Sequence, residues 1–443
     1  MPAVEHTGEG KPETPAPATR PTISRRRRFL AALLTFLVFS LLAAGFLETV
    51  FRLFVPVTDA PVFFWDPLLG PRRMPNQTGR YILRGKFDGR YHFNAQGWND
   101  PRDYVLPKPA GTRRVCLVGD SMVEALGVDT ERSMAIIAED RMNRPDRPVE
   151  WYAFACSGWG PCREYMAIRH YVLDYQPDVV LMMFVQNDPF DCSPYIANLS
   201  DTRPRCSLSA DGELVWQRSR QWVHPWPQRL AIRSAVARYF MLQTGLWGKW
   251  RTRGHTVNVH APLEESTRTY SADSQAADRA ARDERGEKTW LLIEKLFEET
   301  RDECRARGAT FAVVFRGHYE RLHAVARGEA YTPLPRDVDP YCLGRRQDDM
   351  GDDFLRPITE RLNIPYLDLT ETLSRLIRET GQLHHPPNDT HFNVPAHAAA
   401  GAAMGRWVEA LWSAEANGPR PTGSRAPVSP ADRPTDRASR EER

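Results

Sequence analysis

Apolar residues are distributed along the chain in two distinct ways. Residues 29–47 form an unbroken apolar run without a charge, whereas from residue 114 onwards short apolar runs alternate with helix-like segments. As a helix the first run is about 28 Å long, at about 1.5 Å per residue, and a bilayer core is about 30 Å thick. The pattern therefore predicts one transmembrane helix over residues 29–50, followed by a folded domain.

The charges around the apolar run predict its orientation. Arg25 to Arg28 precede the run, and only Glu48 and Arg52 follow it closely. Positive residues favour the cytoplasmic side, so the N-terminus is expected in the cytoplasm and the chain after about residue 50 outside it, in the periplasm or at the cell surface. The arginines also resemble a twin-arginine export signal. The run is longer than a usual signal core and no Ala-x-Ala cleavage site follows it, which favours an uncleaved anchor.

The alternating part of the chain predicts an α/β fold. A strand that is apolar on both faces, as residues 178–186 are, belongs in the middle of a parallel sheet covered by helices. Five strands alternating with helices predict a three-layer α/β/α sandwich with a central parallel sheet. The expected strands are 114–118, 150–156, 178–186, 310–315 and 366–369, and the expected helices are 161–175, 289–307, 354–362, 370–380 and 395–412.

The segments outside this alternation define the domain organisation. Residues 1–28 and 414–443 have no apolar periodicity and are expected to be disordered tails. Residues 51–113 are rich in aromatic residues, proline and glycine, which predicts short strands and turns between the membrane and the main domain, residues 114–413. Residues 190–287 interrupt the alternation with several tryptophans and a polar run, and we interpret them as an insertion, part helical cap and part mobile linker.

Composition narrows the classes of function. The formal charge is only +3 and much of the excess lies in the N-terminal arginine cluster, so a nucleic-acid partner is not expected. In an exported domain, Cys192 with Cys206 and Cys156 with Cys162 are the nearest pairs that could oxidise. Seven cysteines leave at least one thiol unpaired unless it bridges to another chain. Cys116, inside a predicted strand, is expected to be a buried free thiol.

Polar residues stand where the predicted strands end. A Gly-Asp-Ser turn ending in Ser121 follows the first strand, Gly158 follows the second, Asn187 follows the third, and Asp389 with His391 precedes the last helix. Each of these could be an ordinary turn or helix cap. Open α/β sheets bind ligands at the carboxyl ends of their strands, so the four blocks together predict a ligand-binding site at this edge of the sheet.

The order Ser, Gly, Asn and Asp-x-His resembles the SGNH, or GDSL, hydrolase family. The resemblance covers about residues 112–190 and 288–413, and its blocks are Gly119-Asp120-Ser121, Gly158, Asn187 and Asp389-x-His391. Two features depart from the family pattern. Val185 stands where the third block usually has glycine, and the acid lies two residues before the histidine instead of three. The apolar span and the aromatic lead-in are similar to membrane-anchored bacterial members associated with surface polysaccharides.

The resemblance implies acyl transfer through a covalent serine ester. Ser121 would be the nucleophile, His391 the base, and Asp389 the acid that orients His391. The oxyanion would be bound by the backbone N–H groups of Ser121 and Gly158 and by the side-chain amide of Asn187. No cofactor is implied. The histidines and acid of residues 384–391 lack a helix-spaced ligand pair, so no metal ion is expected.

Three functions remain open at this stage. Transfer to water makes an ester hydrolase that acts on O-acyl, in particular O-acetyl, groups of a glycan or small ester. Transfer to a sugar hydroxyl makes an O-acetyltransferase of a surface polysaccharide with the same residues. A non-catalytic glycan-binding assembly protein is the third, and the presence of all four blocks argues against it. Beyond the membrane and an acylated substrate, the resemblance suggests polysaccharide-assembly proteins as partners.

Overall fold

The chain divides into two compact units in the computed structural model. These are Met1–Pro56 and Val57–Arg443. The structure describes residues 24–59, 61–83, 87–195, 204–218, 233–243, 272–331, 349–381 and 390–417. The predicted tails therefore lie largely outside the described residues.

The first unit contains helix α1 (Arg25–Phe54), which includes the predicted span and extends beyond it at both ends. None of its residues is buried, so its apolar side chains are exposed or only partly covered. The helix is long and apolar enough to cross a membrane. A membrane span and an export signal near an N-terminus both have these properties.

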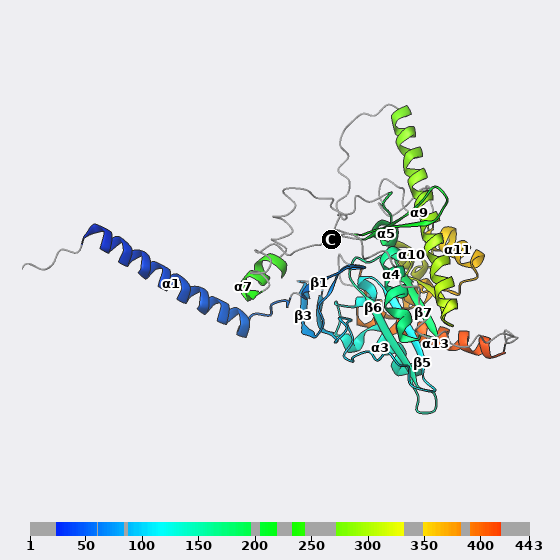
Figure 1. Ribbon diagram of the computed structural model, residues 1–443, viewed down its shortest axis with the longest axis horizontal. Helices are drawn as coiled ribbons and strands as arrows, with labels where there is room; N and C mark the ends of the chain where they lie inside the picture. The colour runs from blue at the N-terminus through cyan, green and yellow to red at the C-terminus, as the bar shows by residue number, and fades with distance from the viewer. Residues whose placement is uncertain are drawn as a thin grey trace, which may run out of the picture. The chain divides into compact units, whose positions relative to one another are not determined.

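The second unit is built on a parallel five-stranded sheet with the strand order β11-β10-β7-β5-β6. Figure 1 labels its strands β5, β6 and β7. All five predicted strands are confirmed, and β5, which leads to Ser121, lies between β6 and β7. The strands are β5 (Arg113–Gly119), β6 (Val149–Ala155), β7 (Val179–Phe184), β10 (Thr310–Phe315) and β11 (Tyr366–Asp368).

Helices cover both faces of this sheet, which confirms the predicted three-layer sandwich. In β5, Val115 and Leu117 point into one apolar core, and Cys116 and Val118 point into the other. The first core is closed by α3 (Met134–Met142), α10 (Tyr319–Ala326), α12 (Thr370–Thr380) and α13 (Val394–Asn417), and the second by α4 (Pro161–His170), α9 (Ala272–Ala306) and α11 (Arg356–Arg361). Each strand is therefore apolar on both faces because each face is covered by helices.

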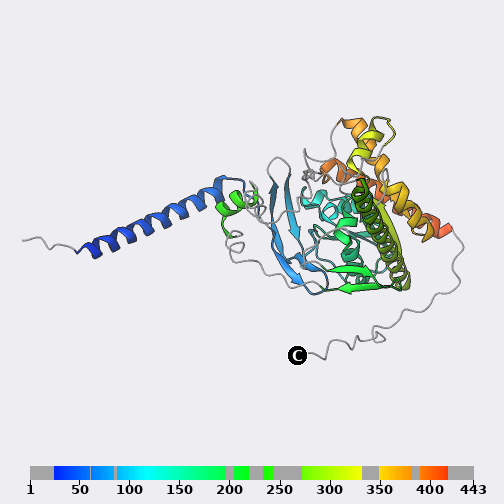
Figure 2. The same ribbon diagram turned by 90° about the horizontal axis from the view of Figure 1, so that it is seen from above.

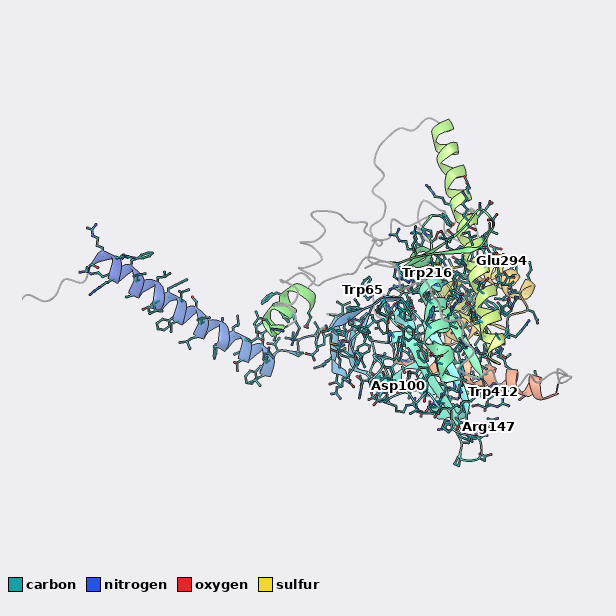
Figure 3. All side chains as sticks on the ribbon, viewed as in Figure 1. Trp65, Asp100, Arg147, Trp216, Glu294 and Trp412 are labelled. Carbon is teal, nitrogen blue, oxygen red and sulfur yellow. The ribbon has the colours of Figure 1, made fainter. Side chains whose placement is uncertain are left out.

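The last helix is fixed to the start of the first sheet strand. The guanidinium of Arg113 lies 4.6 Å from the ring centroid of Trp412, which Figure 3 labels near the end of α13. Gly381 ends the preceding helix α12 in the left-handed conformation, with φ of 63°, as its position in the sequence predicts. The predicted helix 161–175 is divided at Tyr171 into α4 and a 3₁₀ turn, η2 (Val172–Tyr175).

The aromatic lead-in forms two antiparallel pairs, and Figure 2 shows its strands in blue beside the rest of the unit. The pairs are β1 (Phe63–Asp66) with β2 (Gly70–Arg73), and β3 (Gln77–Leu83) with β4 (Phe87–Phe93). A Cβ atom at Gly89 would lie 2.5 Å from the carbonyl oxygen of Val128, so the β4 backbone packs closely against the segment after α2 (Ser121–Glu124). Trp98 is buried against Phe154 and Trp159. The lead-in is thus packed into the domain that contains the sheet.

The inserted region is only partly described. Its described elements are α5 (Asp188–Cys192), β8 (Arg205–Leu208), β9 (Leu214–Gln217), α7 (Ala235–Arg238) and the π-turn η3 (Tyr239–Gln243). Helix α9 begins at residue 272, whereas the sequence pattern places its start at residue 289. Residues 272–288 are rich in helix formers but are polar on every face, so no apolar periodicity distinguishes them from a linker.

The cysteines are arranged differently from the expected pairs. All six described cysteines are buried and free, Cys116 among them as predicted. Cys162 on α4 and Cys192 on α5 have their sulfur atoms 2.9 Å apart. This contact therefore combines one member of each expected pair. The reason is that α4 and α5 pack side by side, which the spacing of the cysteines along the chain does not reveal.

Candidate active site

Ser121 and His391 meet at the carboxyl end of β5, although 270 residues separate them in the sequence. His391 Nε2 lies 2.7 Å from Ser121 Oγ. A hydroxyl in hydrogen-bond contact with an imidazole is the arrangement through which a base activates a serine. Both side chains line a cavity of about 280 Å³, whose other lining residues are Tyr81, Phe87, Met122, Ala125, Leu126, Gly127, Ser157, Phe392 and His397.

The Gly-Asp-Ser turn places Ser121 at the first position of α2. A Cβ atom at Gly119 would lie 2.5 Å from a methyl group of Val123, so glycine allows the helix to fold back over the end of β5. The Asp120 carboxylate caps the helix by accepting from the Met122 N–H at 2.8 Å. Its other oxygen lies 3.3 Å from Ser121 Oγ, so the serine hydroxyl has a second, longer acceptor beside His391.

Three neighbours fix His391 just before α13. Arg316, buried after the end of β10, donates from Nη2 to the carbonyl oxygen of Thr390 at 3.0 Å. The Asn393 side chain accepts from an amide in the first turn of α13 and caps that helix. The ring of Phe87 lies edge-on to the imidazole of His391, with the centroids 5.6 Å apart. The segment that carries His391 is therefore held by contacts from both the sheet and the lead-in.

Two of the three predicted oxyanion donors have no hydrogen-bond acceptor among the described residues and can therefore bind a substrate oxygen. Gly158 lies between β6 and α4 with φ of 76°, a conformation that favours glycine. Within the described part of the chain, the backbone N–H groups of Ser121 and Gly158 have no hydrogen-bond acceptor. The Asn187 amide donates to Asp191 at 2.8 Å and to Asp120 at 3.3 Å. An acyl oxygen bound by Asn187 would replace the longer of these bonds.

The acid of the predicted triad, Asp389, lies outside the described residues. Its role in orienting His391 therefore stays a prediction. The structure does describe the residues directly before the last helix from Thr390 onwards. Among the described residues, no group of three or more His, Cys, Asp or Glu side chains is arranged to hold a metal ion.

Burial keeps several ionisable groups around the site uncharged. Both oxygens of Glu164 and one of Asp188 are buried without a hydrogen-bond partner. Burial, together with repulsion between these carboxyls and Asp120, raises the pKa of Glu164 and of Asp188 well above the usual range. In the cavity wall, burial and the nearby charge of His391 lower the pKa of His397 to about 3. At neutral pH His397 is therefore an uncharged imidazole.

Some residues of the site were not predicted from the sequence. The hairpin β3–β4 contributes Tyr81 and Phe87 to the cavity, and the loop before Gly158 contributes Ser157. A Cβ atom at Gly127 would lie 2.6 Å from the Phe87 ring, so this glycine makes room for the hairpin. In the sequence, Gly127 is the local feature that indicates the close approach of another segment to the residues after Ser121.

Comparison with known proteins finds matches among solved structures only. No family model and no curated protein matches the chain. It is similar to the crystal structure of TesA, with 10% identity, 68% of this chain and 99% of that chain covered, and a TM-score of 0.34. An acetyl xylan esterase, AlAXEase, matches with 11% identity, coverage of 67% and 98%, and a TM-score of 0.32. A GDSL-like lipase from Bacteroides thetaiotaomicron VPI-5482 matches with 8% identity, coverage of 69% and 92%, and a TM-score of 0.31. The fold and the chemistry of the site therefore rest on the residues of this chain.

Proposed function

We propose that the protein is a serine ester hydrolase of the SGNH type, anchored in a membrane by α1 and active outside the cytoplasm. Its substrates are O-acyl, in particular O-acetyl, groups of a glycan or a small ester. The observation that supports this best is the 2.7 Å contact between His391 Nε2 and Ser121 Oγ in the wall of a cavity. A serine hydroxyl is a weak nucleophile, and an imidazole in this position can remove its proton as it attacks.

The reaction proceeds in two acyl transfers. Ser121 Oγ attacks the acyl carbon while His391 Nε2 takes the hydroxyl proton, and the oxyanion accepts from the N–H groups of Ser121 and Gly158 and from Asn187. The bond to the alcohol then breaks, His391 returns the proton to the leaving oxygen, and the acyl group remains on Ser121. Water, deprotonated by His391, attacks this ester, the bond between the acyl carbon and Ser121 Oγ breaks, and His391 returns the proton to Oγ as the carboxylic acid leaves. Asp389 orients His391 throughout.

The cavity favours a small acyl group. Its volume of about 280 Å³ lies near the lower end of ligand pockets, which span about 300–1,000 Å³. Tyr81, Phe87, Met122 and Leu126 make its wall largely apolar, and His397 adds no charge at neutral pH. These features suit the methyl group of an acetyl ester better than a long chain or a charged acyl group.

The arginines at one end of α1 support an N-terminus in the cytoplasm and a catalytic domain outside it.

An acyl group on Ser121 could also pass to a sugar hydroxyl, as in an O-acetyltransferase. Hydrolysis and transfer are separated by measuring the release of acetate from an acetyl ester with and without an added oligosaccharide. Acetate release that is unchanged by the oligosaccharide supports hydrolysis, and acetate release that falls while the oligosaccharide becomes acetylated contradicts it.

The test of the site uses the full chain in detergent and a fluorophosphonate probe that labels activated serines. Labelling and p-nitrophenyl acetate turnover are expected in the wild type and are expected to be lost in Ser121→Ala and His391→Ala. Ser413→Ala, on the exposed side of α13, and His170→Ala, at the end of α4, serve as matched controls that keep both activities. A folded wild type that is neither labelled nor active would show that the protein is not a serine esterase.

A further inference from the structure

A buried ion pair connects the lead-in with the catalytic turn. Arg73, the last residue of β2, donates from Nε to one oxygen of Glu124 at 2.7 Å and from Nη2 to the other at 3.1 Å. The side chains are 6% and 0% exposed. The Arg73 guanidinium also lies 4.0 Å from the ring centroid of Phe63, which orients its plane. Burying two charges is costly, so such a pair requires a geometry that satisfies both groups.

The remaining hydrogen-bonding capacity of Glu124 is used by Ser157. The carboxylate oxygen Oε2 accepts from the Ser157 N–H at 3.0 Å and also from the Ser157 hydroxyl. Ser157 directly precedes Gly158, whose N–H is one of the open oxyanion donors. Because Ser157 is held at both its N–H and its side chain, the peptide group that carries the Gly158 N–H has little freedom to rotate.

Glu124 also belongs to the one-turn helix that presents the nucleophile. It is the last residue of α2, three residues after Ser121. Its N–H donates to the carbonyl oxygen of Asp120 at 3.0 Å, and its carbonyl oxygen accepts from the Asn99 amide at 2.7 Å. One residue therefore connects the two backbone segments that supply the N–H groups of Ser121 and Gly158.

We infer that Glu124, neutralised by Arg73, is a positioning residue that holds the Ser157-Gly158 peptide in line with the Ser121 N–H, so that both donors reach the same acyl oxygen. The inference rests on the proposed function. Arg73 is needed for two reasons. Its guanidinium orients the Glu124 carboxylate through two hydrogen bonds, a bidentate geometry that lysine cannot form. It also cancels a buried negative charge that would otherwise repel the oxyanion in a medium of low dielectric constant.

The inference is tested by steady-state kinetics on p-nitrophenyl acetate with the full chain. Ser157→Ala removes one hydroxyl from the Glu124 carboxylate and is expected to lower kcat about tenfold with KM changed less than about twofold. Glu124→Gln is expected to lower kcat about 100-fold, the effect of a lost oxyanion donor. The double variant is expected to be no worse than Glu124→Gln, because both changes break the same connection. Arg73→Lys is expected to resemble Glu124→Gln.

A matched control is available where another arginine of the lead-in pairs with a carboxylate of the main domain. Glu139 on α3 pairs with Arg102 and accepts from the Trp151 N–H at 2.7 Å, and Asp100, labelled in Figure 3, belongs to the same network. Glu139→Gln therefore breaks an ion pair of the same chemistry that does not contact Ser157. It is expected to lower the urea midpoint of unfolding and to leave kcat unchanged. A purely structural role of Glu124 would give its variant the same phenotype.

The affinity for a boronic acid gives an equilibrium measurement of the same effect, because boronic acids form a tetrahedral adduct with an activated serine. Methylboronic acid is expected to bind Ser157→Ala and Glu124→Gln more weakly, by factors similar to the losses in kcat.

The outcomes separate the two proposals. An inactive, unlabelled wild type overturns the proposed function and this inference with it. An active wild type with an inactive Ser121→Ala variant, and a folded Glu124→Gln variant that keeps its kcat, overturns the inference alone. If Glu124→Gln does not fold, Ser157→Ala decides, and an unchanged kcat in that variant also overturns the inference.

Discussion

His397 makes the stability of the domain sensitive to acid. It lies in the first turn of α13, 2% exposed, and its Nδ1 has no hydrogen-bond partner. Burial, with a smaller contribution from His391, lowers its pKa from an ordinary 6.5 to about 3. Below pH 6.5 the unfolded chain binds a proton at this residue that the folded chain does not bind. The free energy of unfolding therefore falls as the pH decreases from about 6.5 towards about 3.

The size of the effect follows from the two pKa values of His397. At pH 5 the unfolded chain is about 1.5 pH units below its own pKa, while the folded imidazole is still neutral. At about 1.4 kcal/mol per unit, the protonation of the unfolded state destabilises the fold by about 2 kcal/mol. At pH 7.5 the contribution is close to zero, because neither state is protonated.

The measurement is urea unfolding followed by tryptophan fluorescence at pH 7.5 and pH 5, with the full chain in detergent. On this change of pH, His397→Leu is expected to lose about 2 kcal/mol less stability than the wild type, because it has no imidazole to protonate. His170→Leu, at the solvent-exposed end of α4, is expected to change the pH dependence less, because partial burial lowers the pKa of His170 while its ring still reaches water. Equal losses in the wild type and His397→Leu would refute the reasoning.

Other contacts give further predictions. Phe87→Ala removes the edge-on contact with His391 and is expected to lower kcat about fivefold, the equivalent of about 1 kcal/mol, in p-nitrophenyl acetate assays. Glu164→Met removes a buried carboxyl whose pKa is raised in the folded state, so the wild type loses stability as the pH rises and this carboxyl ionises in the unfolded chain. In urea unfolding, the variant is expected to gain about 1–3 kcal/mol of stability at pH 8 and less at pH 5. Diamide is expected to join Cys162 to Cys192 and to stabilise the fold by about 3–4 kcal/mol, the entropy of closing a loop of 30 residues.

Each of these predictions has its own control. Phe87→Leu keeps an apolar side chain and is expected to restore part of the lost kcat, and an unchanged kcat in Phe87→Ala would contradict the role of the ring. A Glu164→Met variant whose gain in stability does not grow with pH would show that the carboxyl is ionised in the fold. Cys162→Ala is expected to abolish the effect of diamide, and a full effect in that variant would place the disulfide elsewhere.

The sheet could be predicted from the sequence because burial on both faces leaves a strong local signal. All six residues of β7 are buried, and they read in the sequence as one continuous apolar run. The start of α9 could not be predicted in the same way, since residues 272–288 show no apolar face. A helix without a buried face differs from a linker only in its propensities, which are weak.

The site could be predicted as far as strand ends determine it. Ser121, Gly158 and Asn187 follow parallel strands, so they gather at one edge of the sheet. The contact of His391 with Ser121 required the resemblance as well, since nothing local connects residues 270 positions apart. The contributions of the lead-in could not be predicted, because the spacing between Arg73 and Glu124 gives no sign that these residues pair.

The separation of Ser121 and His391 along the chain also matters for biosynthesis. Ribosomes make the protein from its N-terminus, so the strands β5, β6 and β7 and the nucleophile exist long before α13. On the proposed function, a chain that is arrested before residue 391 lacks the imidazole that contacts Ser121, and this serine then reacts with acyl donors no faster than an ordinary surface serine. On the same proposal, synthesis of residue 391 and of the helix that follows it is the step that makes Ser121 reactive, and an incomplete copy of the chain is inactive.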